Sequence, residues 1–362
     1  MTDLSDLPIS EHLRGKTPYG APQLRVPVEL NVNENTHPVP QQVVDDIVQR
    51  VRAALGSVNR YPDREFSELR SAFAEYLGHG LTSAQIWAAN GSNEVLQHVL
   101  QAFGGPGRTA LGFTPTYSMY PLLADGTGTR WIAAPRDDHY QLSAERAVAA
   151  IDQHDPDIVF LCSPNNPTGT LLDVDVIRAV AERTRGIVIV DEAYQEFAPD
   201  GSVSALTLLA EFPRLVVSRT MSKAFAFAGA RVGYLAADPA VIDALRLVRL
   251  PYHLSALTQA AALGALAHSS EMLAMVDDIR AQRDRLLREL AVLGYAPAQS
   301  AANFVLFGGV AEPNATFRAL LERGVLIREV GIPHTLRVTA GTEAETTTFL
   351  NALAEVATPL AV

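Results

Sequence analysis

The feature that most constrains this fold is a series of short apolar runs that alternate with segments of helical periodicity. The runs lie at residues 86–89, 109–113, 158–161, 187–190, 215–218 and 232–236. Runs that are apolar at consecutive positions are typical of strands buried on both faces of a sheet. Their alternation with helical segments predicts an α/β fold, in which helices flank a mostly parallel sheet.

The length of the chain indicates more than one domain. It has 362 residues, and a single hydrophobic core usually stops growing at about 250–300 residues. We expect an irregular, proline-rich arm at 1–40, a large domain at 41–265 and a smaller α+β domain at 266–362. Apolar spacing predicts helices at 41–55, 65–77 and 269–293, the first of them packing with the small domain. Strands of the small domain are predicted at 303–307, 325–328 and 335–338.

Composition argues against several classes of function. The formal net charge of −11 disfavours nucleic-acid binding through a general basic face. A single cysteine, Cys162, excludes an intrachain disulfide. The nine histidines show no metal-binding spacing, so no metal site is predicted. The N-terminus lacks the apolar run of a signal peptide, and no segment is long and apolar enough to span a membrane, which predicts a cytoplasmic protein.

Polar loops follow four of the apolar runs, where the chain leaves the predicted sheet. In order they are 90–94, 163–169, 191–194 and 219–225. They supply a helix start with Ser92 and Asn93, an asparagine turn, the carboxylate of Asp191, and Lys223 among hydroxyls. Each has an ordinary structural explanation when taken alone, such as a helix cap or a surface lysine. Ligands bind at the carboxyl ends of strands in such sheets, so the combination predicts a ligand site there.

The same loops resemble the signature of the fold-type I, class I and II aminotransferases, which use pyridoxal 5'-phosphate (PLP). The matching residues are Ser163-Pro164-Asn165-Asn166-Pro167-Thr168-Gly169, Asp191-Glu192-Ala193-Tyr194, and Ser222-Lys223 with Arg231. The resemblance covers nearly the whole chain and implies a seven-stranded sheet in the large domain. It also implies that Lys223 binds PLP covalently and moves a proton, that Asp191 pairs with the pyridine nitrogen, and that Asn166 and Tyr194 hydrogen-bond the phenolic oxygen.

This resemblance assigns the remaining cofactor contacts as well. Residues expected to hold the cofactor phosphate are Ser92, Asn93, Thr220, Ser222 and Arg231. A helix N-terminus suits that anion because its free N–H groups point toward it. Tyr117 is expected to stack on the ring. Tyr61 is expected to reach the cofactor phosphate of a neighbouring subunit, which implies a homodimer with shared active sites.

Four stretches further resemble the histidinol-phosphate aminotransferase subgroup. They are 13–19, 30–35, 219–229, and 326–328 together with 336–339; Thr36 stands where that subgroup usually has proline. The resemblance implies transamination between L-histidinol phosphate and 2-oxoglutarate, giving imidazole acetol phosphate and glutamate in histidine biosynthesis. Arg328 and Arg337 would bind the substrate anion, because guanidinium forks suit phosphate and carboxylate alike. The other expected substrate contacts are Tyr19, Asn35, Tyr120 and Tyr252.

Three other functions share parts of this pattern. An aminotransferase for aromatic amino acids would use the same cofactor residues. A PLP decarboxylase acting on threonine phosphate would also use two arginines. An aminotransferase-like sensor in a regulator normally carries a DNA-binding domain, and the arm of this chain is short and not basic. The sequence favours histidinol-phosphate transamination over these three.

Overall fold

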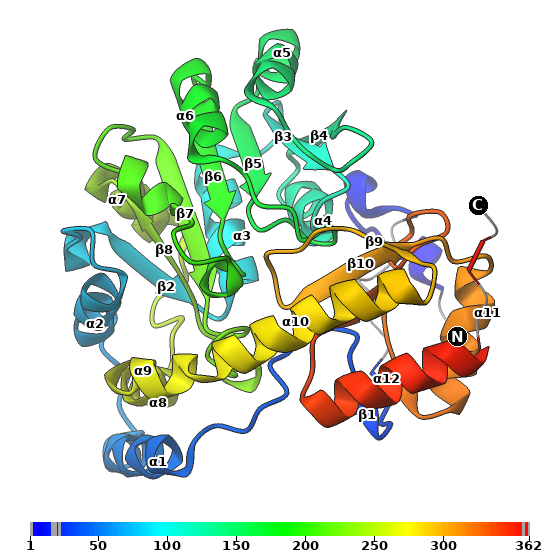
Figure 1. Cartoon of the computed structure of the whole chain (residues 1–362). Helices are drawn as coiled ribbons and strands as arrows, with labels where there is room; N and C mark the ends of the chain where they lie inside the picture. The colour runs from blue at the N-terminus through cyan, green and yellow to red at the C-terminus, as the bar shows by residue number, and fades with distance from the viewer. Residues whose placement is uncertain (1–2, 16–19, 21–22, 357–358, 361–362) are drawn as a thin grey trace.

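A computed structural model describes residues 3–15, 20, 23–356 and 359–360. Its centre is a seven-stranded sheet in the order β2-β8-β7-β6-β5-β3-β4 (Figure 1). The strands are β2 (Ile86–Ala89), β3 (Thr109–Thr114), β4 (Arg130–Pro135), β5 (Ile158–Cys162), β6 (Ile187–Asp191), β7 (Leu215–Thr220) and β8 (Gly233–Ala237). Only β8 in this sheet runs antiparallel to its neighbours. The predicted α/β fold with a mostly parallel sheet is therefore confirmed.

The sheet strands differ in how well their burial could be read from sequence. Every residue of β2, β5, β6, β7 and β8 is buried, as the continuous apolar runs predicted. Strand β4 was not predicted from these runs. It pairs only with β3, at the edge of the sheet, and most of its side chains are exposed or half-buried. Its residues Trp131-Ile132-Ala133-Ala134 are nevertheless a continuous apolar run, like that of β2, so the run was present in the sequence but did not indicate how exposed this strand is.

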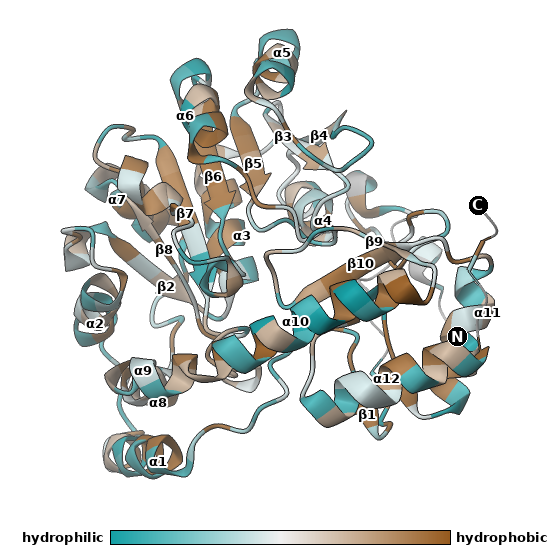
Figure 2. Cartoon of the chain, in the orientation of Figure 1, coloured by the Kyte–Doolittle hydropathy of each residue, from teal (hydrophilic) through white to brown (hydrophobic). Residues whose placement is uncertain are grey.

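Helices on both sides of this sheet complete the larger of two hydrophobic cores. They are α2 (Ser67–Leu77), α3 (Ser92–Phe103), α4 (Met119–Gly126), α5 (Ala144–His154), α6 (Val174–Arg183) and α7 (Pro239–Val248). Side-chain oxygens of Ser143, Asp173 and Asp238 cap the first turns of α5, α6 and α7, which satisfies backbone N–H groups that have no partner inside the helix. Figure 2 shows apolar strands in the middle, with hydrophilic faces on the surrounding helices.

A second hydrophobic core lies in the C-terminal part of the chain. There α10 (Met275–Val292), α11 (Pro313–Glu322) and α12 (Glu343–Val356) accompany a three-stranded sheet. Its strands are β9 (Ala296–Pro297), β10 (Phe304–Gly308) and β12 (Leu336–Thr339). The helix predicted at 269–293 is interrupted at Ala274, giving α9 (Ser269–Leu273) before α10. Two separate cores support the predicted division into domains, whose boundaries at 40 and 265 stay predictions.

The first long helix packs mainly against a helix that belongs to the larger core. α1 (Gln41–Leu55) lies against α8 (Ala256–Ala267), and its buried Val43 belongs to the larger core. The two helices approach so closely that a Cβ added to Gly264 would lie 2.8 Å from Cγ1 of Ile47. α1 also contacts the segment predicted to start the small domain: Gln42 Nε2 donates to Glu271 at 3.3 Å, and Asp46 lies 3.4 Å from His268. Its assignment to that domain stays a prediction. Periodicity identifies the apolar face of a helix but not the surface that covers it.

The N-terminal arm is more regular than its composition predicted. Residues Val28–Glu29 form β1, which pairs in parallel with β11 (Val325–Leu326). The backbone N–H of Asn33 then donates to the hydroxyl of Thr339 at 3.1 Å. A two-residue strand in a proline-rich segment has no periodicity to detect. Within the described ranges of the chain, no helix is both long and apolar enough to cross a membrane.

Candidate active site

A cavity of about 1200 Å³ lies at the carboxyl ends of the sheet strands and reaches the arm and the C-terminal part of the chain. It brings together most of the residues that the sequence predicted for cofactor and substrate: Ser92, Asn93, Tyr117, Asn166, Asp191, Tyr194, Thr220, Ser222, Lys223, Arg231, Arg328 and Arg337. Tyr61, Asn35, Tyr120 and Tyr252 do not line it. Tyr19 lies outside the described residues.

Asp191 forms the floor of the cavity at the last position of β6. Its side chain is buried, and its two carboxylate oxygens accept hydrogen bonds from Ser218 Oγ at 3.1 Å and Tyr120 Oη at 2.8 Å. Burial raises the pKa of Asp191, and these two donors oppose that rise. A protonated ring nitrogen beside this carboxylate would further stabilise its ionised form.

Tyr120 corrects one of our predictions. We expected it to line the substrate pocket, but it is fully buried beneath Asp191 and stacks on Phe160 with ring centroids 4.7 Å apart. Its hydroxyl serves the carboxylate rather than a substrate. Ser218, the other donor, was missed because it lies inside an apolar strand, where sequence alone did not mark it as functional.

Lys223 points its amine into the cavity. Its Nζ donates to the carbonyl oxygen of Val32 at 2.9 Å, so the arm closes over it. Burial, followed by the nearby charge of Arg337, lowers the pKa of Lys223 to about 8, against the opposing charge of Glu34. A lysine with a lowered pKa is partly neutral near neutral pH, as a nucleophile or proton acceptor must be.

A chain of hydrogen bonds fixes Tyr194 and Asn166. The hydroxyl of Tyr194 accepts from Asn33 Nδ2 at 3.0 Å and from Asn166 Nδ2 at 3.3 Å. Arg337 Nη1 donates to Asn166 Oδ1 at 2.5 Å, and its Nη2 donates to the carbonyl of Asn31 at 2.9 Å. Asn31 and Asn33 were not predicted individually, although both lie in the stretch 30–35 that carried the subgroup resemblance.

The opposite end of the cavity concentrates hydrogen-bond donors. α3 begins at Ser92, where its first N–H groups have no partner within the helix. Arg231 Nη1 lies 3.4 Å from Ser222 Oγ. Gly91 has φ +90°, and a Cβ there would lie 2.4 Å from Nη2 of Arg231. Only glycine therefore lets the guanidinium approach the start of α3. This cradle of donors fits a phosphate group.

Tyr117, Arg328 and Arg337 also line the cavity. Tyr117 Oη lies 3.4 Å from Asn93 Oδ1, beside the donor cradle. Arg328 and Arg337 exchange two backbone hydrogen bonds, of 3.0 and 2.9 Å. Residues paired in this way are direct neighbours across two chain segments. The two arginines therefore enter the cavity from adjacent backbone positions.

Asn35 and the tyrosine pair lie outside the cavity. Asn35 Nδ2 donates to the carbonyl of Ala224 at 3.2 Å, and its Oδ1 accepts from the N–H of His37. It therefore fastens the arm beside Lys223, and the prediction that it contacts substrate was wrong for this arrangement. Tyr61 and Tyr252 stack on each other with centroids 4.4 Å apart, and Tyr61 is 79% exposed. Neither reaches the cavity of its own chain.

No group of three or more His, Cys, Asp or Glu side chains in the described part of the chain is arranged to hold a metal ion. Cys162 is buried at the cavity wall, where burial raises the pKa of its thiol to about 12. At neutral pH this thiol is protonated, and protonated thiols are weak nucleophiles. The chemistry of the site therefore rests on one buried amine, one buried carboxylate and two anion-binding regions.

Comparisons with known proteins agree with this geometry. Residues 25–353 match the family model for aminotransferases of class I and II. A histidinol-phosphate aminotransferase of Paenarthrobacter aurescens is 63% identical over 97% of this chain and 95% of its own length. Another, of Thermobifida fusca, is 55% identical over 97% and 95%. The crystal structure of histidinol-phosphate aminotransferase from Sinorhizobium meliloti in complex with PLP has a TM-score of 0.85 and 26% identity, covering 96% of this chain and 97% of that one.

Proposed function

The chain belongs to the aminotransferases of class I and II, and on that premise we propose that it transfers the amino group of L-histidinol phosphate to 2-oxoglutarate. The products are imidazole acetol phosphate and glutamate, in histidine biosynthesis. The observation that carries the substrate assignment is the 63% identity to a histidinol-phosphate aminotransferase over 97% of the chain. The paired arginines in the cavity support it, because both half-reactions require an anion to be held there.

PLP is the cofactor of this enzyme, and the cavity fits it in three respects. A buried amine, Lys223, is available to bind it covalently. The buried acceptor Asp191 suits a protonated ring nitrogen. The donor cradle suits the phosphate; its members are Ser92, Asn93, Thr220, Ser222 and Arg231. When bound, PLP supplies an electron-withdrawing ring that stabilises negative charge at the substrate Cα.

The side chains of the cavity have separate roles in proton transfer, cofactor binding and substrate binding. Lys223 Nζ takes the proton from the substrate Cα, and its lowered pKa makes the neutral amine available near neutral pH. Asp191 holds the ring nitrogen in its protonated state, which maintains its electron demand. Tyr194 and Asn166 would hydrogen-bond the phenolic oxygen of the ring, and Tyr117 would stack on the ring. Arg328 and Arg337 bind the phosphate or carboxylate of the substrate.

The active enzyme is a homodimer in this proposal. Tyr61 and Tyr252 are exposed and do not line the cavity of their own chain, which leaves Tyr61 available to reach the cofactor phosphate of a second copy, as the family resemblance implies. Large exposed apolar residues lie near them in the sequence: Leu55, Val58, Leu247 and Leu250. Burying such side chains against a second copy would stabilise the pair of subunits. The proposed location is the cytoplasm.

A comparison of amino donors tests the substrate assignment. The purified protein is loaded with PLP and given equal concentrations of histidinol phosphate, histidine, phenylalanine and tyrosine, with 2-oxoglutarate as acceptor. The largest kcat/KM is expected for histidinol phosphate. If phenylalanine or tyrosine gives the larger value, the enzyme is an aromatic aminotransferase. Release of carbon dioxide from threonine phosphate would identify a decarboxylase instead.

A further inference from the structure

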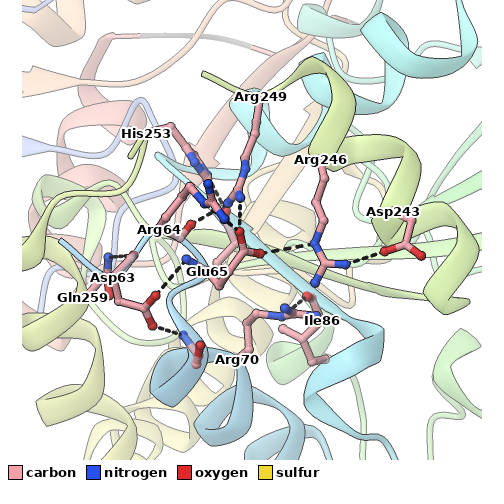
Figure 3. A network of polar contacts seen from close by, with 12 residues as sticks. Asp63, Arg64, Glu65, Arg70, Ile86, Asp243, Arg246, Arg249, His253 and Gln259 are labelled. Atoms are coloured by element: carbon pink, nitrogen blue, oxygen red, sulfur yellow. Dashed lines mark hydrogen bonds and ion pairs between the residues drawn. The ribbon is translucent and has the colours of Figure 1, made fainter. Parts of the chain in front are cut away.

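A cluster of ion pairs outside the cavity joins two segments that are distant in sequence (Figure 3). The carboxylate of Glu65 accepts hydrogen bonds from Arg249 Nη2 and, at 3.2 Å, from Arg246 Nε. Arg249 Nη1 also donates to the carbonyl of Arg64 at 2.5 Å. We refer to Glu65, Arg246 and Arg249 as the Glu65 clasp. It ties the turn before α2 to the end of α7 and the loop that follows.

Two further residues hold the same segments together. The carboxylate of Asp63 accepts from the backbone N–H of Glu65 at 2.9 Å and of Ser67 at 2.7 Å, which closes the turn and caps α2. Gln259 Nε2 donates to the carbonyl of Asp63 at 3.1 Å and to that of Leu254 at 2.9 Å. The turn is thus tied to the loop on both sides of Tyr252. Neither segment can shift without breaking several hydrogen bonds.

These two segments carry the exposed tyrosine pair. Tyr61 lies four positions before Glu65, and Tyr252 lies three positions after Arg249. Their rings stack 4.4 Å apart at an angle of 15°, although Tyr61 is 79% exposed. An exposed side chain normally samples several rotamers. The stack holds its geometry only while the two backbones keep their separation, and the clasp sets that separation.

The guanidinium of Arg249 makes the clasp stiffer than a surface ion pair. Its side chain is 7% exposed and lies over the ring of Trp87, 5.3 Å from the ring centre. Burial acts to raise the pKa of Glu65, but the hydrogen bond and charge of Arg249, with the charge of Arg246, lower it. Glu65 is therefore ionised at neutral pH. Removing this charge would leave the largely buried guanidinium of Arg249 without its counter-charge, so the two segments that the clasp joins are expected to shift.

We propose that Glu65 is a positioning residue for the active site of the neighbouring subunit, because its clasp fixes the Tyr61–Tyr252 stack that enters that site. The inference rests on the proposed homodimer. Glu65 touches neither cofactor nor substrate. It acts through Tyr61, so losing its charge should weaken the hold on PLP in the partner's cavity and leave the cavity of its own chain intact.

The first test compares two matched variants. Glu65→Gln removes the charge of the clasp, and Glu68→Gln removes an equivalent charge from an exposed position of α2, three residues further on. Glu65→Gln should raise the dissociation constant of PLP, measured by its absorbance in titrations of apoprotein, by about threefold to tenfold, the effect of about one hydrogen bond. Glu68→Gln should leave it unchanged. Equal effects of the two variants, or none from Glu65→Gln, would overturn the proposal.

The second test asks in which subunit the change acts. Differently tagged subunits carrying Glu65→Gln and Lys223→Ala are mixed, and the hybrid dimer is isolated. Its only site with a lysine then receives Tyr61 from the subunit whose clasp is intact. That site should bind PLP as tightly as the wild type. A dissociation constant still raised as in the Glu65→Gln homodimer would place the effect within one chain and refute the inference.

The same experiment separates this inference from the proposed dimer. A hybrid of Tyr61→Phe with Lys223→Ala should also regain wild-type affinity. If it does and the Glu65→Gln hybrid does not, the inference fails and the shared site stands. If neither does, the shared site itself is wrong. Should Glu65→Gln give no folded protein, Arg246→Gln breaks the more exposed side of the clasp, and the same recovery across subunits is required of it.

Discussion

Asp191 and Tyr61 differ in whether their own chain supplies the contacts of their side chains. Asp191 is 3% exposed, and both of its oxygens are held by side chains of its own sheet and of the helix packed on it. Tyr61 is 79% exposed and stacks only on Tyr252, which is itself 38% exposed. The first arrangement is complete within one chain, whereas the second lacks a partner for its hydroxyl side. Changes at the floor of the cavity should therefore affect mainly the rate of the chemical step. Changes at the substrate side of the cavity, and at Tyr61 outside it, should affect mainly the binding of substrate and cofactor.

The largest effect is expected at the floor, from Lys223→Ala, which should abolish turnover because no other lysine among the described residues lines the cavity. The sequence contains two lysines, Lys16 and Lys223, so the attachment point can be identified without ambiguity. Borohydride reduction of the PLP-loaded protein, followed by peptide mapping, should place the label on Lys223. Lys16→Ala is the control and should keep both label and activity. Label on Lys16 would contradict the assignment.

Asp191→Asn should come next, slowing the proton-transfer step by orders of magnitude while PLP still binds. The amide keeps the size of the carboxylate but loses the charge that holds the ring nitrogen protonated. Tyr120→Phe provides a graded comparison, since it removes one hydrogen bond to the same carboxylate and should cost only about fivefold to tenfold. Single-turnover rates measure both. Wild-type rates in Asp191→Asn would make this residue structural.

Arg328→Ala probes the substrate side of the cavity. Charge-assisted hydrogen bonds contribute about 1.5–3 kcal/mol each, so kcat/KM for histidinol phosphate should fall by about ten- to a hundredfold. The loss with phenylalanine as donor should be smaller, because a carboxylate carries less charge than a phosphate. Arg323→Ala, on the exposed surface at the end of α11, serves as the control. An equal fall in kcat/KM for both donors would mean that Arg328 does not distinguish the phosphate from a carboxylate.

The smallest effect is expected from a buried histidine between the two regions. Trp87 Nε1 donates to Nδ1 of His98 at 3.1 Å, which requires that nitrogen to be unprotonated. Burial lowers the pKa of His98 to about 4. The unfolded chain, with an ordinary histidine pKa near 6.5, therefore binds more protons between these values, and stability should fall as the pH drops from about 6.5 toward 4.

Urea unfolding at pH 7 and pH 5 measures this loss. His98→Asn should reduce the difference between the two midpoints, although His253, whose pKa burial also lowers, keeps part of it. His139→Asn changes an exposed histidine and should leave the difference unchanged. A pH dependence that is unaffected by His98→Asn would assign it to other groups.

The strengths of sequence-based prediction follow from burial. Strands β5, β6 and β7 were predicted because both of their faces are covered, which leaves an unbroken apolar run. Asp191, which ends β6, and Lys223, three residues after the end of β7, could then be placed at one edge of the sheet by topology alone. β1 was missed because a two-residue strand carries no such pattern, whereas β4 was missed although residues 131–134 form an apolar run.

Most of the wrong predictions for site residues arose because the sequence does not show which way a side chain points. Tyr120 lies on a helix near the cavity, but sequence spacing did not show that its ring faces the sheet. Asn33 and Asn35 are two positions apart in an irregular segment; one holds Tyr194 and the other fastens the backbone beside Lys223. For a related reason the sequence did not show that α1 packs against α8. Which surfaces meet depends on the arrangement of elements far apart in the chain.

The arm that covers Lys223 has a consequence for the order of events during synthesis. Asn33 bonds to Thr339, 306 residues later, and β1 pairs with β11. A ribosome adding about 5–20 residues per second needs roughly 15–60 seconds to make that interval. The large sheet can form once its last strand, β8, has been made, while residues 28–33 still lack the strand that will receive them. The pocket therefore matures last, and a nascent chain released short of Thr339 would hold its lysine uncovered.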